Sequence, residues 1–122
     1  MKPMGPIPPG FAMDNDGALM IGGQRFDALI AQAGDTPLFV YDLALVRERI
    51  AALRAAMPDG LRIHYAMKAN PLPQLVQAVA QWVDGLDVAS GGEMMIARNA
   101  HAHVSFAGPG KRDAELEAAL RA

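Results

Sequence analysis

Lys68 is the residue of this sequence whose type and position best suit covalent chemistry. It follows an alternating, strand-like run at residues 61–66 and precedes an Asn-Pro break at residues 70–71. In α/β barrels, residues at the carboxyl ends of strands face the active site. A lysine that is partly buried there keeps some neutral amine, which can condense with a carbonyl group. A solvated lysine at a strand end fits the same position, so spacing alone leaves both interpretations open.

The histidines offer a weaker signal for chemistry. His101 and His103 are two residues apart and could approach one metal ion. Two ligands with no acid or thiol nearby are too few for a specific metal site. We therefore predict no metal site and place both at the surface or at a strand edge. His64 alternates with Ile63 and Tyr65, which favours a residue of the sheet wall over a catalyst.

Composition excludes several classes of partner. The chain has 122 residues, of which 52% are hydrophobic and 20% charged, with a net charge of −2 and no cysteine. So small a charge gives no field to attract nucleic acid or an anionic membrane. Because there is no cysteine, thiolate chemistry is excluded.

The glycine-rich stretch at residues 108–111 lacks the spacing of a phosphate-binding loop and predicts a turn. No signal peptide or membrane span is recognisable, so we expect a cytoplasmic protein.

Residues 1–36 are expected to form an N-terminal segment. Proline, glycine and aspartate dominate residues 1–16, which predicts an irregular, extended lead-in. Two short strands at residues 18–21 and 24–26 flank Gly22 and Gly23, the pattern of a hairpin with a two-residue turn. Asp27 is placed to cap a short helix through Gln32, which the stretch that begins at Gly34 interrupts.

Residues 37–122 alternate between helical and strand-like periodicity. After an apolar run at residues 38–41, a stripe formed by Val46, Ile50, Leu53 and Met57 predicts an amphipathic helix that begins near Asp42. Strands are predicted at residues 61–66, 85–89 and 103–107, and helices after residue 73, at 91–99 and at 112–122. This order is typical of an α/β fold with a parallel sheet.

Three blocks of sequence resemble one enzyme family. Residues 65–71 read YAMKANP, residues 83–93 read VDGLDVASGGE, and residues 104–111 read VSFAGPGK. In this order they resemble the fold type III pyridoxal-phosphate enzymes, the group of diaminopimelate and ornithine decarboxylases. The resemblance runs from about residue 36 to residue 122 and is nearest to the decarboxylases associated with exosortase systems. It implies the N-terminal part of a pyridoxal-phosphate-binding (β/α)8 TIM barrel, preceded by the hairpin.

The resemblance assigns roles to five residues. Lys68 would form a Schiff base with pyridoxal 5'-phosphate and later act as acid or base, and Asp87 would lie near it and orient its ammonium group. Ala66, Ser90 and Glu93 match positions around the cofactor. Ser90 and Glu93 fit equally well as the cap and first-turn acid of a helix. Asp87 also fits a strand-end aspartate that bonds to a loop.

The function implied by the resemblance is decarboxylation of an amino acid by a homodimer. A racemase of the same fold and a non-catalytic cofactor-binding relative stay open as alternatives. A full barrel needs about 250 residues, and the sequence ends within a helical pattern. We therefore expect the first strand–helix units of a longer enzyme, with the phosphate site on later strands. The 122 residues alone are expected to be inactive.

Overall fold

The protein is described by a computed structural model that covers residues 6–100 and 103–121. The chain forms two compact units, which divide between Leu45 and Val46. The division at residue 36 stays a prediction about domains. His101 lies outside the described residues, as do residues 1–5 at the start.

The first unit begins with a three-stranded antiparallel sheet of β1 (Ala12–Met13), β2 (Leu19–Ile21) and β3 (Gln24–Arg25). The predicted hairpin is confirmed: Gly22 and Gly23 join β2 to β3 with φ angles of 56° and 77°. A two-residue turn with both φ angles positive suits glycine because it lacks a Cβ atom.

The lead-in prediction was wrong for β1. Ala12–Met13 pairs with β2 instead of remaining irregular. The turn between these strands is closed by Asp14, whose Oδ1 accepts hydrogen bonds from the N–H groups of Asp16 and Ala18. The Ala18 N–H and the Arg25 guanidinium hold the pKa of Asp14 below its ordinary value. An aspartate that bonds to the backbone two residues ahead is a turn signal.

Helix α1 (Phe26–Ala33) follows β3 directly. It begins one residue before the predicted cap, because Arg25 occupies the N-cap position and Asp27 lies in the first turn. The helix ends one residue later than predicted, and Gly34 interrupts it as expected: Gly34 has a φ of 88° and its N–H donates to Ile30 O. A glycine in this left-handed conformation commonly ends a helix.

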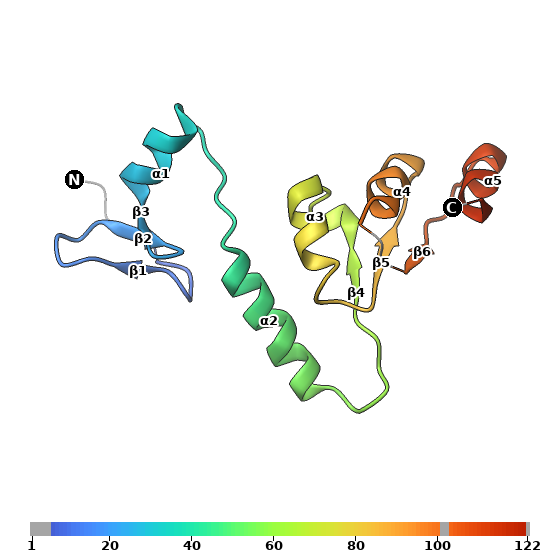
Figure 1. Ribbon diagram of the computed structural model, residues 1–122, viewed down its shortest axis with the longest axis horizontal. Coiled ribbons are helices and arrows are strands. Elements are labelled where there is room, and N and C mark those ends of the chain that lie inside the picture. Colours follow the sequence, from blue (N-terminus) through green and yellow to red (C-terminus); the bar gives the residue numbers. More distant parts are fainter. Residues whose placement is uncertain (1–5, 101–102, 122) are drawn as a thin grey trace. The chain divides into compact units, whose positions relative to one another are not determined.

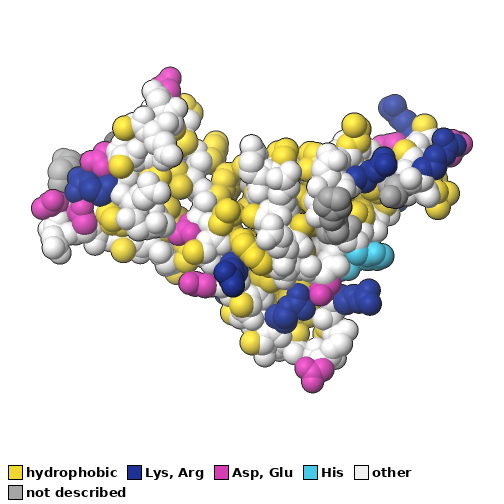
Figure 2. Space-filling view, viewed as in Figure 1, with side chains coloured by type: hydrophobic (Ala, Val, Ile, Leu, Met, Phe, Trp, Pro, Cys, Tyr) yellow, Lys and Arg dark blue, Asp and Glu magenta, His cyan; other side chains and the backbone are white. Residues whose placement is uncertain are grey.

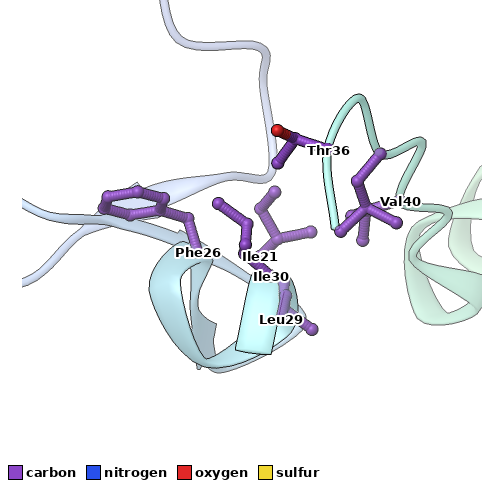
Figure 3. Close-up of a pocket in the computed structure, with 7 residues that line it drawn as sticks. Ile21, Phe26, Leu29, Ile30, Thr36 and Val40 are labelled. Atoms are coloured by element: carbon purple, nitrogen blue, oxygen red, sulfur yellow. The ribbon is translucent and has the colours of Figure 1, made fainter. Parts of the chain in front are cut away.

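The apolar run at residues 38–41 forms neither helix nor strand. Two of its side chains, with residues of β2 and α1, line a small cavity of about 180 Å³ (Figure 3). The residues that line this cavity are Ile21, Phe26, Leu29, Ile30, Thr36, Leu38 and Val40. None of them is ionisable, so the cavity packs hydrophobic side chains and offers no group for acid–base chemistry.

Helix α2 (Leu43–Ala56) confirms that a helix forms here. Asp42 Oδ1 accepts a hydrogen bond from the Ala44 N–H at the start, and Pro58 follows the end. The predicted apolar stripe is not buried: Val46 is partly exposed and half of the Leu53 side chain is exposed.

The second unit contains a parallel sheet in the order β4-β5-β6, formed by β4 (His64–Ala66), β5 (Gly85–Val88) and β6 (Val104–Phe106). Figure 1 shows the three strands together with the helices that follow them. These are the 3-10 helix η1 (Met67–Ala69) and the α-helices α3 (Pro73–Val79), α4 (Gly91–Arg98) and α5 (Asp113–Leu120). The predicted α/β order and parallel pairing are confirmed.

Strand β4 is shorter than predicted, because it begins at His64 and not at Leu61. The Ile63 N–H donates to Asp84 Oδ2 at 2.8 Å, and the Asp84 N–H donates to Ile63 O at 2.8 Å. A side chain therefore takes the place of a ladder partner just before the strand. Leu61, ahead of this contact, is 55% exposed.

The two faces of the parallel sheet differ in chemistry. Alternate residues of a strand point to opposite faces, so Leu86, Val88 and Tyr65 share one face, where they pack with α3 and α4 around a buried core. The buried members of this core are Met67, Val76, Leu86, Val88, Met94 and Ala97. The other face carries small and polar side chains.

Within the described residues, no helix has the length and hydropathy needed to cross a membrane. Charges of both signs are mixed on the surface. Figure 2 shows Lys and Arg side chains interspersed with Asp and Glu, with exposed hydrophobic side chains between them. An example is Arg25, which pairs with Asp14, Asp16 and Asp27. On the face shown, such pairing leaves no broad field of one sign among the described residues.

Candidate active site

The polar face of the sheet aligns three side chains near the carboxyl ends of the strands. Ala66 is the register partner of Asp87, and Asp87 is the register partner of Ser105. Each of the three is partly buried. In a parallel sheet the carboxyl ends of neighbouring strands meet at one edge, where ligands of α/β proteins bind. This row is therefore the part of the second unit best placed to act on a ligand.

Lys68 lies beyond this row, in η1 directly after β4. Its side chain is exposed, whereas the preceding Met67 is fully buried in the core. The apolar neighbours in the sequence therefore anchor the backbone and do not enclose the amine. Among the described residues, the Lys68 ammonium has no hydrogen-bond or ion-pair partner. The backbone of Lys68 is thus fixed at the strand end while its side chain stays exposed.

The loop that follows Lys68 is fixed by hydrogen bonds of its own. The Tyr65 hydroxyl donates to Asn70 O at 3.0 Å, and the Leu72 N–H donates to Asn70 Oδ1 at 3.1 Å. Asn70 thus closes the turn between η1 and α3. The YAMKANP block, in which these residues lie, has a structural role in addition to presenting the lysine.

Asp87 forms its contact with Ser105 and not with Lys68. The Ser105 hydroxyl donates to Asp87 Oδ1 at 2.8 Å, and within the described part of the chain no ion pair joins Asp87 to Lys68. The alternative of a strand-end aspartate bonded to a loop does not hold either, because Ser105 belongs to β6. A direct orienting contact with Lys68 stays a prediction.

Ser90 and Glu93 form the cap of α4. Ser90 is the N-cap, and its Oγ accepts a hydrogen bond from the Glu93 N–H at 3.2 Å. Glu93 Oε2 in turn accepts from the Ala89 N–H at 2.8 Å. The predicted helix-capping role is thus present. The role of both residues at the cofactor stays a prediction.

Sequence reasoning missed Ser105 and the contact it makes with His64. His64 Nδ1 lies 3.3 Å from Ser105 Oγ, although β5 separates their strands. The residue between them is Gly85, where an added Cβ would lie 2.7 Å from His64 Cε1. A glycine inside a strand often marks such a close approach, and this signal was available in the sequence.

Two other predicted groups do not add to the site. His103 is exposed, and its ring makes an edge contact with that of His64 at a centroid distance of 6.0 Å. Lys111 donates to Gly108 O at 2.7 Å and lies 5.2 Å from the centre of the Phe106 ring. The predicted turn at residues 108–111 is thus held by its own lysine. Within the described residues, no three His, Asp or Glu side chains gather as a metal site would require.

Comparison with known protein families identifies the family of this chain. Residues 43–122 match the family described as "Pyridoxal-dependent decarboxylase, pyridoxal binding domain". The chain belongs to this family. The second unit is accordingly the N-terminal portion of the pyridoxal-binding barrel, and the antiparallel strands of the first unit precede it.

Relatives within the pyridoxal-dependent decarboxylases share much of this chain. The chain is 42% identical to a diaminopimelate decarboxylase of Aquifex aeolicus over 86% of its own length and 25% of the relative. It is 33% identical to 2-[(L-alanin-3-ylcarbamoyl)methyl]-2-hydroxybutanedioate decarboxylase of Staphylococcus aureus, over 77% of this chain and 24% of that one. The chain therefore spans about a quarter of the length of these relatives.

A solved structure agrees with the fold. The crystal structure of AQ1208 from Aquifex aeolicus superposes with a TM-score of 0.82 at 38% sequence identity. The match covers 93% of this chain and 28% of the other. The order of strands and helices described above is thus that of a known protein.

The residues of this pyridoxal-binding domain fit part of the cofactor. The unpartnered amine of Lys68, at the carboxyl end of a parallel strand, suits the aldehyde group. The start of α4 does not offer the Gly91 N–H to the phosphate group, because this N–H already donates to Glu115 Oε1 at 3.0 Å. The described residues thus fit the reactive end of the cofactor.

Proposed function

We propose that the protein carrying this chain is a pyridoxal-phosphate-dependent amino-acid decarboxylase similar to diaminopimelate decarboxylase, with Lys68 as the residue that holds the cofactor. The observation that carries the proposal is the unpartnered amine of Lys68 at the carboxyl end of β4, in a chain of the pyridoxal-binding family. The names of the relatives support decarboxylation as the reaction.

Pyridoxal phosphate, when bound, supplies an electron sink that takes up the charge left as a carboxylate leaves the α-carbon of an amino acid. Lys68 would hold the cofactor covalently through Nζ, and its amine, once released, would hold or move a proton near the α-carbon. Asp87 would orient the ammonium group of Lys68 through its negative charge. Ala66, with its small side chain, leaves space on the same face. Ser90 and Glu93 would fix the start of α4 at the rim of the site.

The cofactor assignment is tested by covalent trapping in the full-length protein. The protein is mixed with pyridoxal phosphate, reduced with borohydride and digested with trypsin. Trypsin does not cleave at a modified lysine, so a label on Lys68 is expected on a peptide of residues 63–98, and a label on Lys111 would lie on residues 99–112. In Lys68→Arg, trypsin cleaves after residue 68, and the resulting peptides of residues 63–68 and 69–98 should carry no label. Lys111→Arg should leave the label on residues 63–98 unchanged. A label that persists on another lysine in Lys68→Arg overturns the assignment.

The reaction is tested separately with L- and D-amino acids, including meso-diaminopimelate. Release of carbon dioxide from one of them is expected. Racemisation without release would overturn the decarboxylase proposal while leaving the cofactor assignment intact. Binding of the cofactor with neither reaction would favour the non-catalytic alternative. Light scattering of the full-length protein tests the predicted homodimer in the same preparations.

A further inference from the structure

A chain of three hydrogen-bonded side chains crosses the polar face of the parallel sheet. It runs from His64 on β4 to Ser105 on β6 and from there to Asp87 on β5. We propose that Ser105, itself held by His64, is a positioning residue. It fixes the carboxylate of Asp87 beside the end of β4, which Lys68 follows. The effect on catalysis rests on the proposed function, whereas the chain of hydrogen bonds rests on the distances alone.

The donors and acceptors in this chain follow from the chemistry of the three groups. A serine hydroxyl has one proton, and an ionised carboxylate can only accept. Two acceptors compete for that proton, Asp87 Oδ1 at 2.8 Å and Leu86 O at 3.5 Å. The shorter, charge-assisted bond to Asp87 is the stronger one. Ser105 Oγ must therefore accept from His64 Nδ1, which identifies the Nδ1–H form of His64.

Gly85 makes the contact between β4 and β6 possible. It is the register partner of His64 on the intervening strand. A Cβ atom at this position would lie 2.7 Å from both His64 Cε1 and the carbonyl oxygen of His103. Because glycine has no such atom, the imidazole can lie across β5 and reach Ser105. Each of the three strands thus supplies one hydrogen-bonding side chain, and Gly85 on the central strand leaves room for the imidazole of His64.

The arrangement positions a carboxylate and does not activate a nucleophile. In a catalytic triad the serine donates to an imidazole, which removes its proton. Here the serine donates to the carboxylate instead, so its oxygen gains no general base. The consequence falls on Asp87: Oδ1 is occupied, and among the described residues Oδ2 has no hydrogen bond. Ser105 therefore leaves one carboxylate oxygen available to Lys68 or to a group bound there.

The first test reads the tautomer of His64 in the cofactor-free, full-length protein. Side-chain ¹⁵N shifts distinguish Nδ1–H from Nε2–H, and the spectrum of His64→Asn assigns the signal. The Nδ1–H form is expected in the wild type and in Ser105→Thr, which keeps the hydroxyl. Ser105→Ala should release His64 from this form. An Nε2–H tautomer in the wild type would overturn the proposal, because Ser105 would then donate to His64 and not to Asp87.

The second test reads catalysis. Loss of a hydrogen bond to a charged group predicts a decrease of about ten-fold in kcat for Ser105→Ala, with KM and cofactor loading unchanged. Ser105→Thr should restore kcat, which a merely structural defect of the sheet would not explain. An unchanged kcat in Ser105→Ala would contradict the positioning role. Trapping at a lysine other than Lys68 would instead refute the proposed function, while the tautomer measurement would still decide the hydrogen-bond chain.

Discussion

Arg54 and Asp84 form an ion pair that connects α2 to the residue preceding β5, with Arg54 Nη1 3.0 Å from Asp84 Oδ2. The same oxygen accepts the Ile63 N–H at 2.8 Å. Arg54 Nη2 also donates to Trp82 O at 3.2 Å. Asp84 thus links a helix, the approach to β4 and the start of β5. It helps to set the register of β4, which Lys68 follows, and of β5, which carries Asp87.

Asp84 should make the stability of the protein depend on pH in the acid range. The Ile63 N–H, followed by Arg54, holds the pKa of Asp84 below its ordinary value of 3.8. Because the folded-state pKa is depressed, the stabilisation is fully present above the ordinary value and is lost as the pH falls through the folded-state pKa. We expect Asp84→Asn to lower the melting temperature at pH 7, with a difference from the wild type that shrinks below pH 3.8.

Thermal unfolding followed by circular dichroism across this pH range measures the effect. Asp59→Asn, in the exposed turn after α2, is the matched control and should leave the melting temperature unchanged. A difference between Asp84→Asn and the wild type that stays constant down to the lowest pH would contradict the account.

Leu86 is the buried centre of the core beneath the site. Its side chain is fully buried between β5 and the helices. Leu86→Ala should lower the free energy of unfolding by about 2–5 kcal/mol, through lost burial and the cavity left behind. Leu61→Ala is the control, because Leu61 is 55% exposed and surface changes are usually within about 0.5 kcal/mol. Equal effects of the two changes in denaturant titrations would show that the core lies elsewhere.

Gly85 is predicted to tolerate no side chain. A Cβ would meet the His103 backbone oxygen at 2.7 Å, and backbone cannot move aside as a flexible side chain can. Gly85→Ala should therefore cost about 1–3 kcal/mol of stability, the scale of overpacking, and should displace the His64 ring. Gly110→Ala is the control, because nothing lies within 4 Å of a Cβ there. An unaltered His64 NMR signal in Gly85→Ala would argue against the contact across β5.

The sequence predicts the regular elements of this protein well because their signals are local. The hairpin follows from Gly22 and Gly23, and the helix after residue 42 follows from its apolar spacing. The resemblance proposed Lys68 and Asp87 as site residues, and their roles stay predictions, whereas the family match supports the enzyme class. What the sequence did not predict is non-local: Ile63 bonds to Asp84 and shortens β4, and Ser105 meets Asp87. Such pairs depend on strand register, which no single segment determines.

Glu115 on α5 should stabilise the start of two helices at once. Its Oε2 accepts the Arg112 N–H and its Oε1 accepts the Gly91 N–H, each at 3.0 Å. These two backbone contacts, the Arg112 bond first, hold the pKa of Glu115 below its ordinary value of 4.5. The stabilisation is therefore present above that value and is lost as the pH falls through the depressed pKa.

Amide hydrogen exchange of the first turns of α4 and α5 measures this stabilisation. Glu115→Gln should speed exchange in both helices at pH 7, whereas Glu117→Gln, whose carboxylate contacts Arg121, should not affect α4. Faster exchange in α5 alone would mean that Glu115 does not hold α4.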